Sequence, residues 1–473
     1  MIMKRQIIVY PTHIEVYPYE WGNVRRIEDQ YSVWDPIYYK SIPVAYTVIN
    51  NTLYLPRGAS VAELERIFDT PAYIDNDIDP DDKIEINTDI TPKSKIQGDA
   101  IDFLCKTDNH QLSLNLEPGE GKTIATITAI CNKFKTKTII ILHESKLKNQ
   151  WRREFHHASD ISDDEIVDIK GSDQMQKVMD GEVNGSIYLV NHQTIHSFAK
   201  INGWYKVKEF FSKIHCGLKV FDEAHKYFNN ILMIDFFSNT KTTIYLTATF
   251  TRTHKKEKFI FRRAFSECSR FGENEDNGRR HHIEYYYVTY DSHPDPCVMY
   301  GMYNKFSISP FKYIEYALNE ENNTMLKVLK MVLKQVERLK GKIFITSPKI
   351  NSSEVIAEYI SKLYPDKKVV AINSTNDAES NEAALNSDII SSTMKSVGTG
   401  LDVKGMRVFI NLEPFTAESN MIQLKGRLRE YSETEDTYFF DIVDIGFDDI
   451  KRMGETRRKT MKRFAKIIKD VRL

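Results

Sequence analysis

Short apolar runs rich in β-branched residues alternate with helix-like segments over most of this chain of 473 residues. Between about residues 91 and 270 the runs are TKTIIIL, GSIYLV, LKVFDE and TTIYLTAT, and each ends at polar or small residues. A second series extends from HHIEYYYV through GKIFIT, KKVVAIN, SDIISST and MRVFINLE. This alternation is typical of parallel sheets whose two faces are covered by helices. The sequence therefore predicts an α/β fold with two parallel-sheet lobes in tandem.

The residues before the first lobe have a different pattern. Residues 1 to about 72 are rich in aromatic and β-branched residues broken by turn formers, which predicts short strands, hairpins and one helix in ASVAELERIF with Ser60 as its N-cap. The acidic stretch YIDNDIDPDDKIEINTDI is predicted to be a linker, because like charges repel and Pro80 cannot join a strand ladder. We therefore expect a small N-terminal α+β accessory domain over residues 1–88 that ends in the acidic linker. Its aromatic residues favour a DNA-binding role by stacking on bases, with an ordinary core as the alternative.

The remaining boundaries follow from the two strand series and from the tail. The first lobe is expected over residues 89–275 and the second over residues 276–450, with a polar join at FGENEDNGRRHH. In the tail, TRRKTMKRFAKIIKDVRL, apolar residues recur at helical spacing among many Arg and Lys residues. A basic C-terminal helix over residues 451–473 is therefore expected, either docked with an ordinary charged exterior or contacting phosphates.

Composition limits the kinds of partner and the cellular setting. The formal net charge is -1, so any affinity for nucleic acid must come from local basic patches. The five cysteines are scattered without a CxxC pair, which argues against a zinc site or a disulfide framework and favours a reducing compartment. No signal peptide and no run of about 18 apolar residues is evident. We expect a protein of the cytoplasm that has no membrane partner.

The stretch EPGEGKT lies between a strand-like run, QLSLNL, and a helix-like run, TIATITAI. Glycines here let backbone amides approach an anion at a helix N-terminus, where the helix dipole favours negative charge. Lys122 could then reach the β- and γ-phosphates of a nucleotide, and the Thr123 hydroxyl could bind Mg²⁺. Leu116 occupies the place of the first glycine in the strict phosphate-loop pattern. The alternative is a glycine-bearing helix start with an exposed lysine.

A second motif, VFDEAH, places two adjacent acids at the end of an apolar strand about 100 residues further on. Asp222 would hold magnesium, and Glu223 would orient and deprotonate the attacking water. A helix N-terminus with favourable acids is the simpler alternative for this motif alone. Together with the GKT loop, the pair favours ATP hydrolysis.

GEGKT, DEAH, LTAT (246–249) and QLKGRLR (423–429), in this order, resemble the motifs of superfamily two helicases over about residues 91 to 445. The resemblance implies two RecA-like lobes, ATP and Mg²⁺ as cofactors, and DNA as the partner. It implies a nucleotide site of Gln97, Pro118, Gly119, Glu120, Gly121, Lys122, Thr123, Gly400 and Asp402, with Asp222 as the second metal ligand. It also implies a coupling role for His225, Thr247 and Thr249, and catalytic roles for Lys122, Glu223, Gln423, Arg427 and Arg429.

One arginine role stays open within this resemblance. The last arginine of the family's motif falls at Glu430 here, so either Arg427 or Arg429 would reach the γ-phosphate, and Arg427 is favoured. The resemblance also implies contacts with the nucleic-acid backbone from Ser145, Lys146, Gln150, Thr194, Ser347 and Thr393; each could equally lie in a solvated loop.

LYLPRG, SVGTGLDVKG, YNKFS and NEENN are most similar to phage branch-migration helicases (UvsW-like). That similarity implies an ATP-dependent DNA helicase acting on forked or junction DNA in recombination, repair or replication, in the host cytoplasm if a phage encodes it. The alternatives are a duplex DNA translocase that does not separate strands, and an ATP-switched nucleic-acid clamp. An RNA helicase is less favoured because the aromatic-rich leader resembles the DNA-acting branch.

Overall fold

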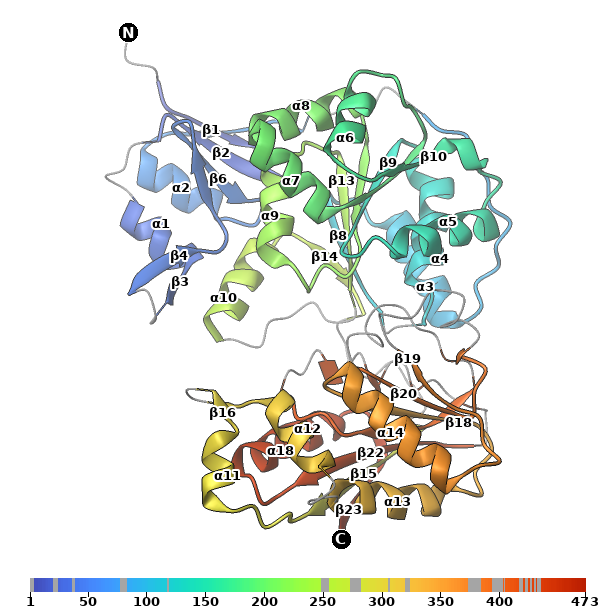
Figure 1. Cartoon of the computed structure of the whole chain (residues 1–473). Coiled ribbons are helices and arrows are strands. Elements are labelled where there is room, and N and C mark those ends of the chain that lie inside the picture. The colour runs from blue at the N-terminus through green and yellow to red at the C-terminus, as the bar shows by residue number, and fades with distance from the viewer. Residues whose placement is uncertain are drawn as a thin grey trace. The chain divides into compact units, whose positions relative to one another are not determined.

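The computed structural model describes residues 4–19, 24–35, 39–76, 83–116, 119–247, 255–272, 282–304, 307–319, 324–372, 384–393, 403, 405–416, 420–421, 424–425, 428, 431 and 435–473. The chain divides into two compact units, Met1–Glu275 and Asp276–Leu473 (Figure 1). None of the described helices is both long enough and apolar enough to cross a membrane.

The first unit begins with a small sheet of five strands in the order β5-β6-β2-β1-β7. Its strands are β1 (Gln6–Val9), β2 (His13–Tyr17), β5 (Thr47–Ile49), β6 (Thr52–Pro56) and β7 (Ala72–Ile74). Helix α1 (Val24–Tyr31) leads into a separate hairpin of β3 (Ser32–Asp35) and β4 (Lys40–Pro43). Helix α2 (Val61–Phe68) begins as predicted, because the Ser60 hydroxyl accepts a hydrogen bond from the Glu63 amide.

The acidic stretch is more than the linker that its charge predicted. Its first residues lie in β7, which pairs in parallel with β1, and residues 77–82 are outside the described part of the chain. Ile84 and Ile86 are buried in the core of the first lobe. The prediction was wrong here because isoleucines at a spacing of two place one apolar face on the lobe while the acids face outward.

The first lobe is a sheet of seven strands in the order β10-β11-β9-β12-β13-β8-β14, with every pairing parallel. The strands are β8 (Gln111–Asn115), β9 (Thr138–Leu142), β10 (Ile166–Ile169), β11 (Ile187–Asn191), β12 (Leu218–Phe221), β13 (Thr242–Thr247) and β14 (Ser269–Phe271). Within β9, Ile139 and Ile141 enter one core cluster while Ile140 and Leu142 enter another. Both faces of the sheet are therefore buried, as the continuous apolar runs predicted.

Helices cover both faces of this sheet (Figure 1). One face carries α3 (Lys95–Lys106), α4 (Lys122–Ala129) with the π-helical turn Ile130–Phe134, and α5 (Leu147–Ala158). The other face carries α6 (Ser172–Met179), α7 (His192–Asn202), α8 (Trp204–Ile214), α9 (Phe228–Phe236) and α10 (Lys255–Ala264), and a short 3₁₀ turn occupies Asp163–Glu165. The N-terminal sheet packs on this second side, where the ring of Tyr54 lies 4.6 Å from that of Phe237.

The second unit repeats the architecture with the strand order β19-β20-β18-β21-β22-β15-β23, again with every pairing parallel. The strands are β15 (Ile283–Tyr290), β18 (Lys342–Ser347), β19 (Val369–Ile372), β20 (Ile389–Thr393), β21 (Met406–Asn411), β22 (Thr437–Asp444) and β23 (Ala465–Arg472). The helices are α11 (Pro296–Gly301), α12 (Pro310–Leu318), α13 (Thr324–Val336), α14 (Ile350–Leu363) and α18 (Asp448–Met461), and a small hairpin joins β16 (Tyr303–Asn304) to β17 (Ser307–Ile308).

The C-terminal segment corrects the prediction of a terminal basic helix. Helix α18 ends at Met461, and Ala465–Arg472 forms the edge strand β23, parallel to β15. The apolar residues of AKIIKDVR fit a half-buried edge strand as well as a helix, and pairing with β15 decides between the two. Some of the tail's basic residues also pair with acids, as Arg458 does with Asp470 and Lys469 with Glu284. Arg457 is buried against Asp441.

Candidate active site

The loop between β8 and α4 has the backbone that its glycines predicted. Gly119 and Gly121 have φ of +87° and +88°, which lies in the left-handed region that favours glycine. Gly121 is also the N-cap of α4, and a Cβ atom added there would lie 2.0 Å from the Gln97 amide nitrogen. The left-handed conformation therefore favours glycine immediately before Lys122, and a larger residue would also displace the Gln97 side chain.

Gln97 lies against this loop, on the first turn of α3, with 2% of its surface exposed. Its Oε1 atom accepts a hydrogen bond of 2.8 Å from the Lys93 amide, and its Nε2 atom lies 3.4 Å from the Gly121 carbonyl oxygen. The Lys93 amino group donates a 2.6 Å hydrogen bond to the Gly119 carbonyl. Lys93 was not predicted to belong to the site. Only its place four residues before Gln97 could have indicated it.

Lys122 is the first residue of α4, and its amino group donates a 2.7 Å hydrogen bond to the Leu116 carbonyl at the end of β8. Thr123 follows in the same helical turn. Glu120 lies in the loop itself. The loop thus presents the amino terminus of a helix and one lysine at the carboxyl edge of the sheet, an arrangement that suits a phosphate group.

The two adjacent acids lie at the same edge, just after β12. The Asp222 amide donates a 3.0 Å hydrogen bond to the Ile141 carbonyl, and its carboxylate accepts one of 3.0 Å from the Trp151 indole. Glu223 has a φ of +53°, a left-handed conformation that is costly for a residue other than glycine. Trp151 was not identified from the sequence as part of the site, because no pattern near α5 indicates that its indole reaches Asp222 after β12.

Neighbouring charges shift the pKa values of Asp222 and Glu223 in opposite directions. Burial raises the pKa of Asp222, and the negative charge of Glu223 raises it further. Burial alone would also raise the pKa of Glu223, but the positive charges of His225, Lys122 and Lys226 outweigh burial and lower it. Glu223 therefore stays ionised, as a base must, while a cation close to Asp222 would lower the raised pKa of that carboxyl again.

His225, which follows the two acids after β12, contacts the end of β13 through its side chain. The ring nitrogen Nδ1 of His225 lies 2.9 Å from the Thr247 hydroxyl at the end of β13, and 3.3 Å from the Glu223 carboxylate. Lys226 contacts the ring of His143 at 2.9 Å. Burial, followed by the charge of Lys226, lowers the pKa of His143 to about 3, so this ring is neutral near pH 7. His143 and Lys226 are further residues that sequence reasoning did not single out.

The donor set fits magnesium held together with a substrate phosphate. Magnesium sites of this kind use one or two carboxylates and take the other ligands from phosphate and water. Asp222 and Thr123 would supply such ligands, and the described residues contain no cluster of three or more His, Cys, Asp or Glu that could hold a metal alone. The buried Oε2 atom of Glu223 accepts no hydrogen bond within the described part of the chain, although His225 Nδ1 lies 3.3 Å from it.

Residues predicted to contact nucleic acid follow strand ends in each unit. In the first unit, Ser145 and Lys146 are exposed after β9, Gln150 lies on α5, and Thr194 lies in the first turn of α7. The Ser145 hydroxyl accepts a 2.6 Å hydrogen bond from the Asn191 side chain.

The corresponding residues of the second unit, Ser347 and Thr393, end the neighbouring strands β18 and β20 and are both buried. The Ser347 hydroxyl donates to the Lys349 carbonyl and holds the start of α14. Because Ser347 is buried, the alternative of a solvated loop does not hold for it, and its contact with nucleic acid stays a prediction. Pro118, Thr249, Gly400, Asp402, Gln423, Arg427 and Arg429 lie outside the described residues.

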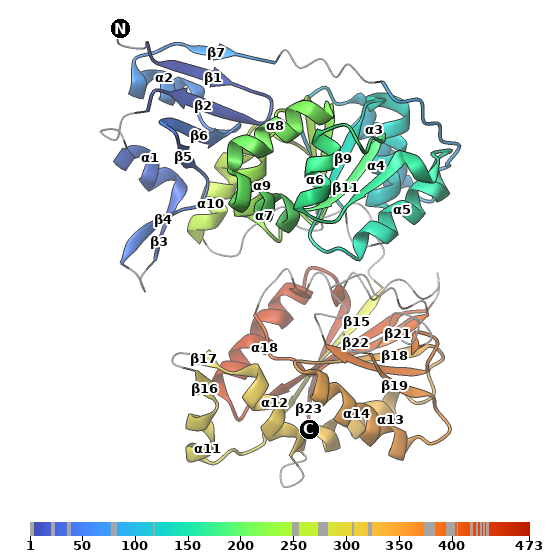
Figure 2. The same cartoon turned by 45° about the horizontal axis from the view of Figure 1, so that its top comes forward.

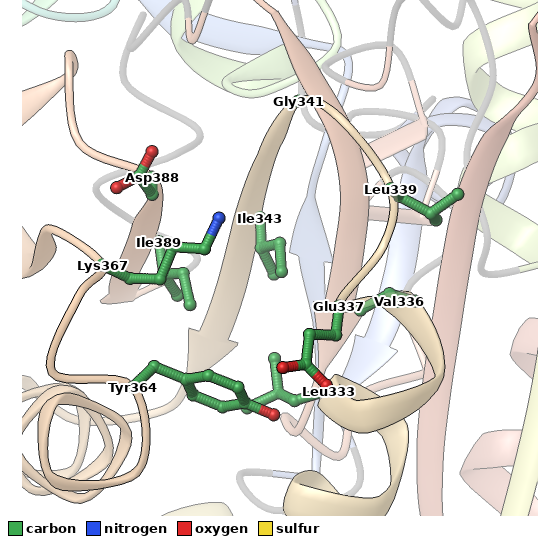
Figure 3. Close-up of a pocket in the computed structure, with 10 residues that line it drawn as sticks. All are labelled: Leu333, Val336, Glu337, Leu339, Gly341, Ile343, Tyr364, Lys367, Asp388 and Ile389. Atoms are coloured by element: carbon green, nitrogen blue, oxygen red, sulfur yellow. The ribbon is translucent and has the colours of Figure 1, made fainter.

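A pocket in the second unit lies at the amino ends of its strands, whereas the glycine loop and the two acids of the first unit lie at carboxyl ends. It is a cavity of about 30 Å³ where β18 and β20 begin, with Leu333, Glu337 and Tyr364 around it (Figure 3). A space of this size holds about one water molecule, far less than a nucleotide needs. It is therefore not the nucleotide site.

The first of the two RecA-like parallel-sheet lobes carries a glycine loop with Lys122 and the DEAH sequence at one edge of its sheet. Residues 87–252 match the family described as type III restriction enzyme, res subunit. The chain is 30% identical over 144 residues to a putative DNA 3'-5' helicase Rad25 of Haloarcula marismortui, an alignment that covers 30% of this chain and 21% of that protein. The chain thus spans about a fifth of that relative's length.

A second relative is similar over more of the chain. The transcript termination protein A18 of Yaba monkey tumor virus is 23% identical over 360 residues, which cover 72% of this chain and 69% of that protein.

Solved structures share the fold. The type ISP restriction-modification enzyme LlaBIII bound to DNA has a TM-score of 0.57 at 13% identity, covering 81% of this chain and 31% of that one. T4 UvsW aligns with 99% of this chain and 100% of its own at 15% identity and a TM-score of 0.38, on which we base no conclusion.

Proposed function

We propose that this protein is an ATP-dependent DNA helicase or translocase that unwinds or branch-migrates forked and junction DNA, in recombination, repair or replication. The observation that carries the proposal is the meeting of Lys122, Asp222 and Glu223 at one sheet edge. Strands β8 and β12 flank β13, and all three run in parallel, so their carboxyl ends reach the same side. The loop would hold the phosphates, and Glu223 would accept a proton from the attacking water.

Magnesium, held by Thr123 and Asp222, would neutralise charge on the phosphates during hydrolysis. Gln97, buried beside the loop, would contact the adenine base. The second lobe would supply the remaining positive charge through Arg427 or Arg429, with Gln423 beside them and Gly400 and Asp402 near the nucleotide. Because the two lobes would share one nucleotide, binding and hydrolysis would move them relative to each other.

The choice of DNA rests on the relatives. One is named a DNA 3'-5' helicase, and a structure with the same fold is bound to DNA. Repeated lobe movement on a phosphate backbone, gripped by residues such as Lys146 and Thr194, would carry the protein along a strand. Two readings compete with this proposal, a duplex translocase that does not separate strands and a clamp that binds DNA under ATP control. In each case we place the protein in the cytoplasm.

An ATPase assay with five activators tests the proposal: single-stranded, duplex, forked and four-way DNA, and RNA. Forked or four-way DNA is expected to stimulate hydrolysis most. Lys122→Ala should abolish hydrolysis and strand separation, since the phosphates lose their lysine, while Lys106→Ala, an exposed lysine of α3, should leave both unchanged. Stimulation by duplex DNA without strand separation would favour the translocase. Nucleotide-controlled binding without stimulated turnover would favour the clamp.

A further inference from the structure

Two large aromatic side chains face solvent on neighbouring elements of the first unit. Trp34 on hairpin strand β3 is 53% exposed, and Phe259 on α10 is 57% exposed. Strand β3 and helix α10 contact each other and lie side by side in both views (Figures 1 and 2). Single exposed aromatic residues are common, but exposed apolar surface on adjoining elements is typical of interaction sites. Tyr39, 80% exposed, adds a third ring on the same hairpin.

Arg263 holds the two elements together. Its guanidinium group lies 5.6 Å from the centre of the Tyr31 ring and 5.9 Å from that of Phe259, and it forms a 2.6 Å ion pair with Glu63. Tyr31 directly precedes β3, so this arginine connects α10 to the base of the hairpin. On the other face of α10, Ile260 and Phe261 are buried. Phe259 is therefore presented from a helix that is fixed on two sides.

The charges around the rings are basic. Helix α10 carries five basic residues and one acidic residue, Glu257. Lys256 and Arg262 are exposed and lie three residues before and after Phe259, which places them on the same face of the helix. Lys40 is exposed on β4, opposite Asp35 in the hairpin register. On a chain whose net charge is only -1, this is a local positive patch.

We propose that Trp34 and Phe259 form a stacking platform for the bases of single-stranded nucleic acid, with Lys256 and Arg262 contacting its phosphates. This inference rests on the proposed function and adds a second contact region to it, on the N-terminal hairpin and α10. Unpaired bases stack on aromatic side chains, whereas bases inside a duplex do not expose their faces. A protein interface would be expected to hold fewer charges among its aromatic residues.

Binding of a labelled oligothymidine of roughly 20 nucleotides to the full chain tests the platform. The double variant Trp34→Ala/Phe259→Ala should bind about 10- to 100-fold more weakly, because each ring loses a stacked base. A blunt duplex of the same length should lose much less affinity. Tyr300→Ala is the matched control, since Tyr300 is 87% exposed on α11 of the second unit and should not matter.

Two gentler variants keep the test sharp if the double variant is poorly folded. Trp34→Phe retains a ring and should bind within about threefold of the wild type, but should lose part of the tryptophan fluorescence quenching that stacking produces. Trp151 is buried and Trp204 half-buried, so an exposed tryptophan signal arises from Trp34 among the described ones. Lys256→Gln/Arg262→Gln should lower the salt dependence of binding.

Three results would overturn the platform. The double variant could bind oligothymidine as tightly as the wild type, Trp34→Phe could leave quenching unchanged, or the double variant could lose only a concentration-dependent self-association, which would make the patch a protein surface. Failure of the proposed function gives a different result, because the wild type would then hydrolyse ATP at the same rate with and without any nucleic acid. The two failures are therefore distinguishable.

Discussion

Glu223 combines a strained backbone with a buried acceptor atom and a ring of positive charge. Its left-handed conformation costs on the order of 1–3 kcal/mol, which the surrounding structure must offset. Two contacts hold the residue in this conformation. The Asp222 amide donates a hydrogen bond to the Ile141 carbonyl on β9, and the Glu223 carboxylate contacts His225. Strain that is held in place at a strand end beside a phosphate loop is typical of a functional residue.

Glu223→Gln is expected to lower ATP turnover by about 10²- to 10⁴-fold, because an amide cannot accept the proton of the attacking water. Nucleotide affinity should change little, since the loop and Lys122 remain. Single-turnover hydrolysis and equilibrium binding of a labelled nucleotide measure the two effects separately. Glu358→Gln, an exposed glutamate of α14, serves as the control. Normal turnover in Glu223→Gln would contradict the assignment of the base.

At the scale of elements, most of the first lobe and part of its site could be predicted from the sequence. Continuous apolar runs predicted β9, β11 and β12. The glycines of the loop followed from the backbone that they permit. Local patterns could not predict contacts between distant segments, such as Trp151 with Asp222 or Lys93 with Gly119.

In the C-terminal tail, a local pattern predicted a helix where pairing with a distant strand forms β23 instead. The tail's apolar spacing matched a helix, but the edge of the second sheet was open beside β15, and a strand could pair there. A sequence read segment by segment cannot show which sheet edges remain to be paired. Arg457 is a related case, because a helical pattern cannot reveal that its guanidinium group is buried 2.9 Å from an Asp441 carboxylate oxygen on the neighbouring strand β22.

Arg457→Met is expected to destabilise the second unit by about 3–5 kcal/mol, because it leaves the carboxylate of Asp441 buried without its ion-pair partner. Tyr285 would still donate a hydrogen bond to that carboxylate, which limits the loss. Arg458→Met, which breaks the exposed pair with Asp470, should cost less than about 1 kcal/mol. Urea unfolding followed by circular dichroism gives both values, and equal destabilisation by the two variants would refute the buried-pair interpretation.

At the scale of the whole molecule, four histidines of the first unit have lowered pKa values: His13, His143, His192 and His196. Burial is the main cause for each, and it favours the neutral ring. The unfolded chain would protonate these rings below about pH 6.5, whereas the folded unit would not. The unfolded state then binds more protons, so folding stability falls as the pH drops below this value.

The first unit is therefore expected to lose stability between about pH 6.5 and 4, with each histidine contributing up to about 1.4 kcal/mol per pH unit. Urea unfolding at a series of pH values measures the slope. His192→Asn should make the slope shallower, because burial and His196 lower the pKa of His192 to about 4. His157→Asn, at an exposed position of α5, should leave it unchanged. A slope unaffected by His192→Asn would count against this explanation.

The N-terminal sheet shares one hydrophobic cluster with the first lobe, through contacts such as that of Tyr54 with Phe237 and the 2.7 Å hydrogen bond from Thr12 to the Ser238 carbonyl. A fragment that begins at residue 87 would keep the entire family match. It would also expose the hydrophobic surface of the first lobe that the N-terminal sheet buries. We expect such a fragment to aggregate in solution, because this apolar surface would face water. A stable fragment of this protein therefore has to include the N-terminal sheet and the residues that precede position 87.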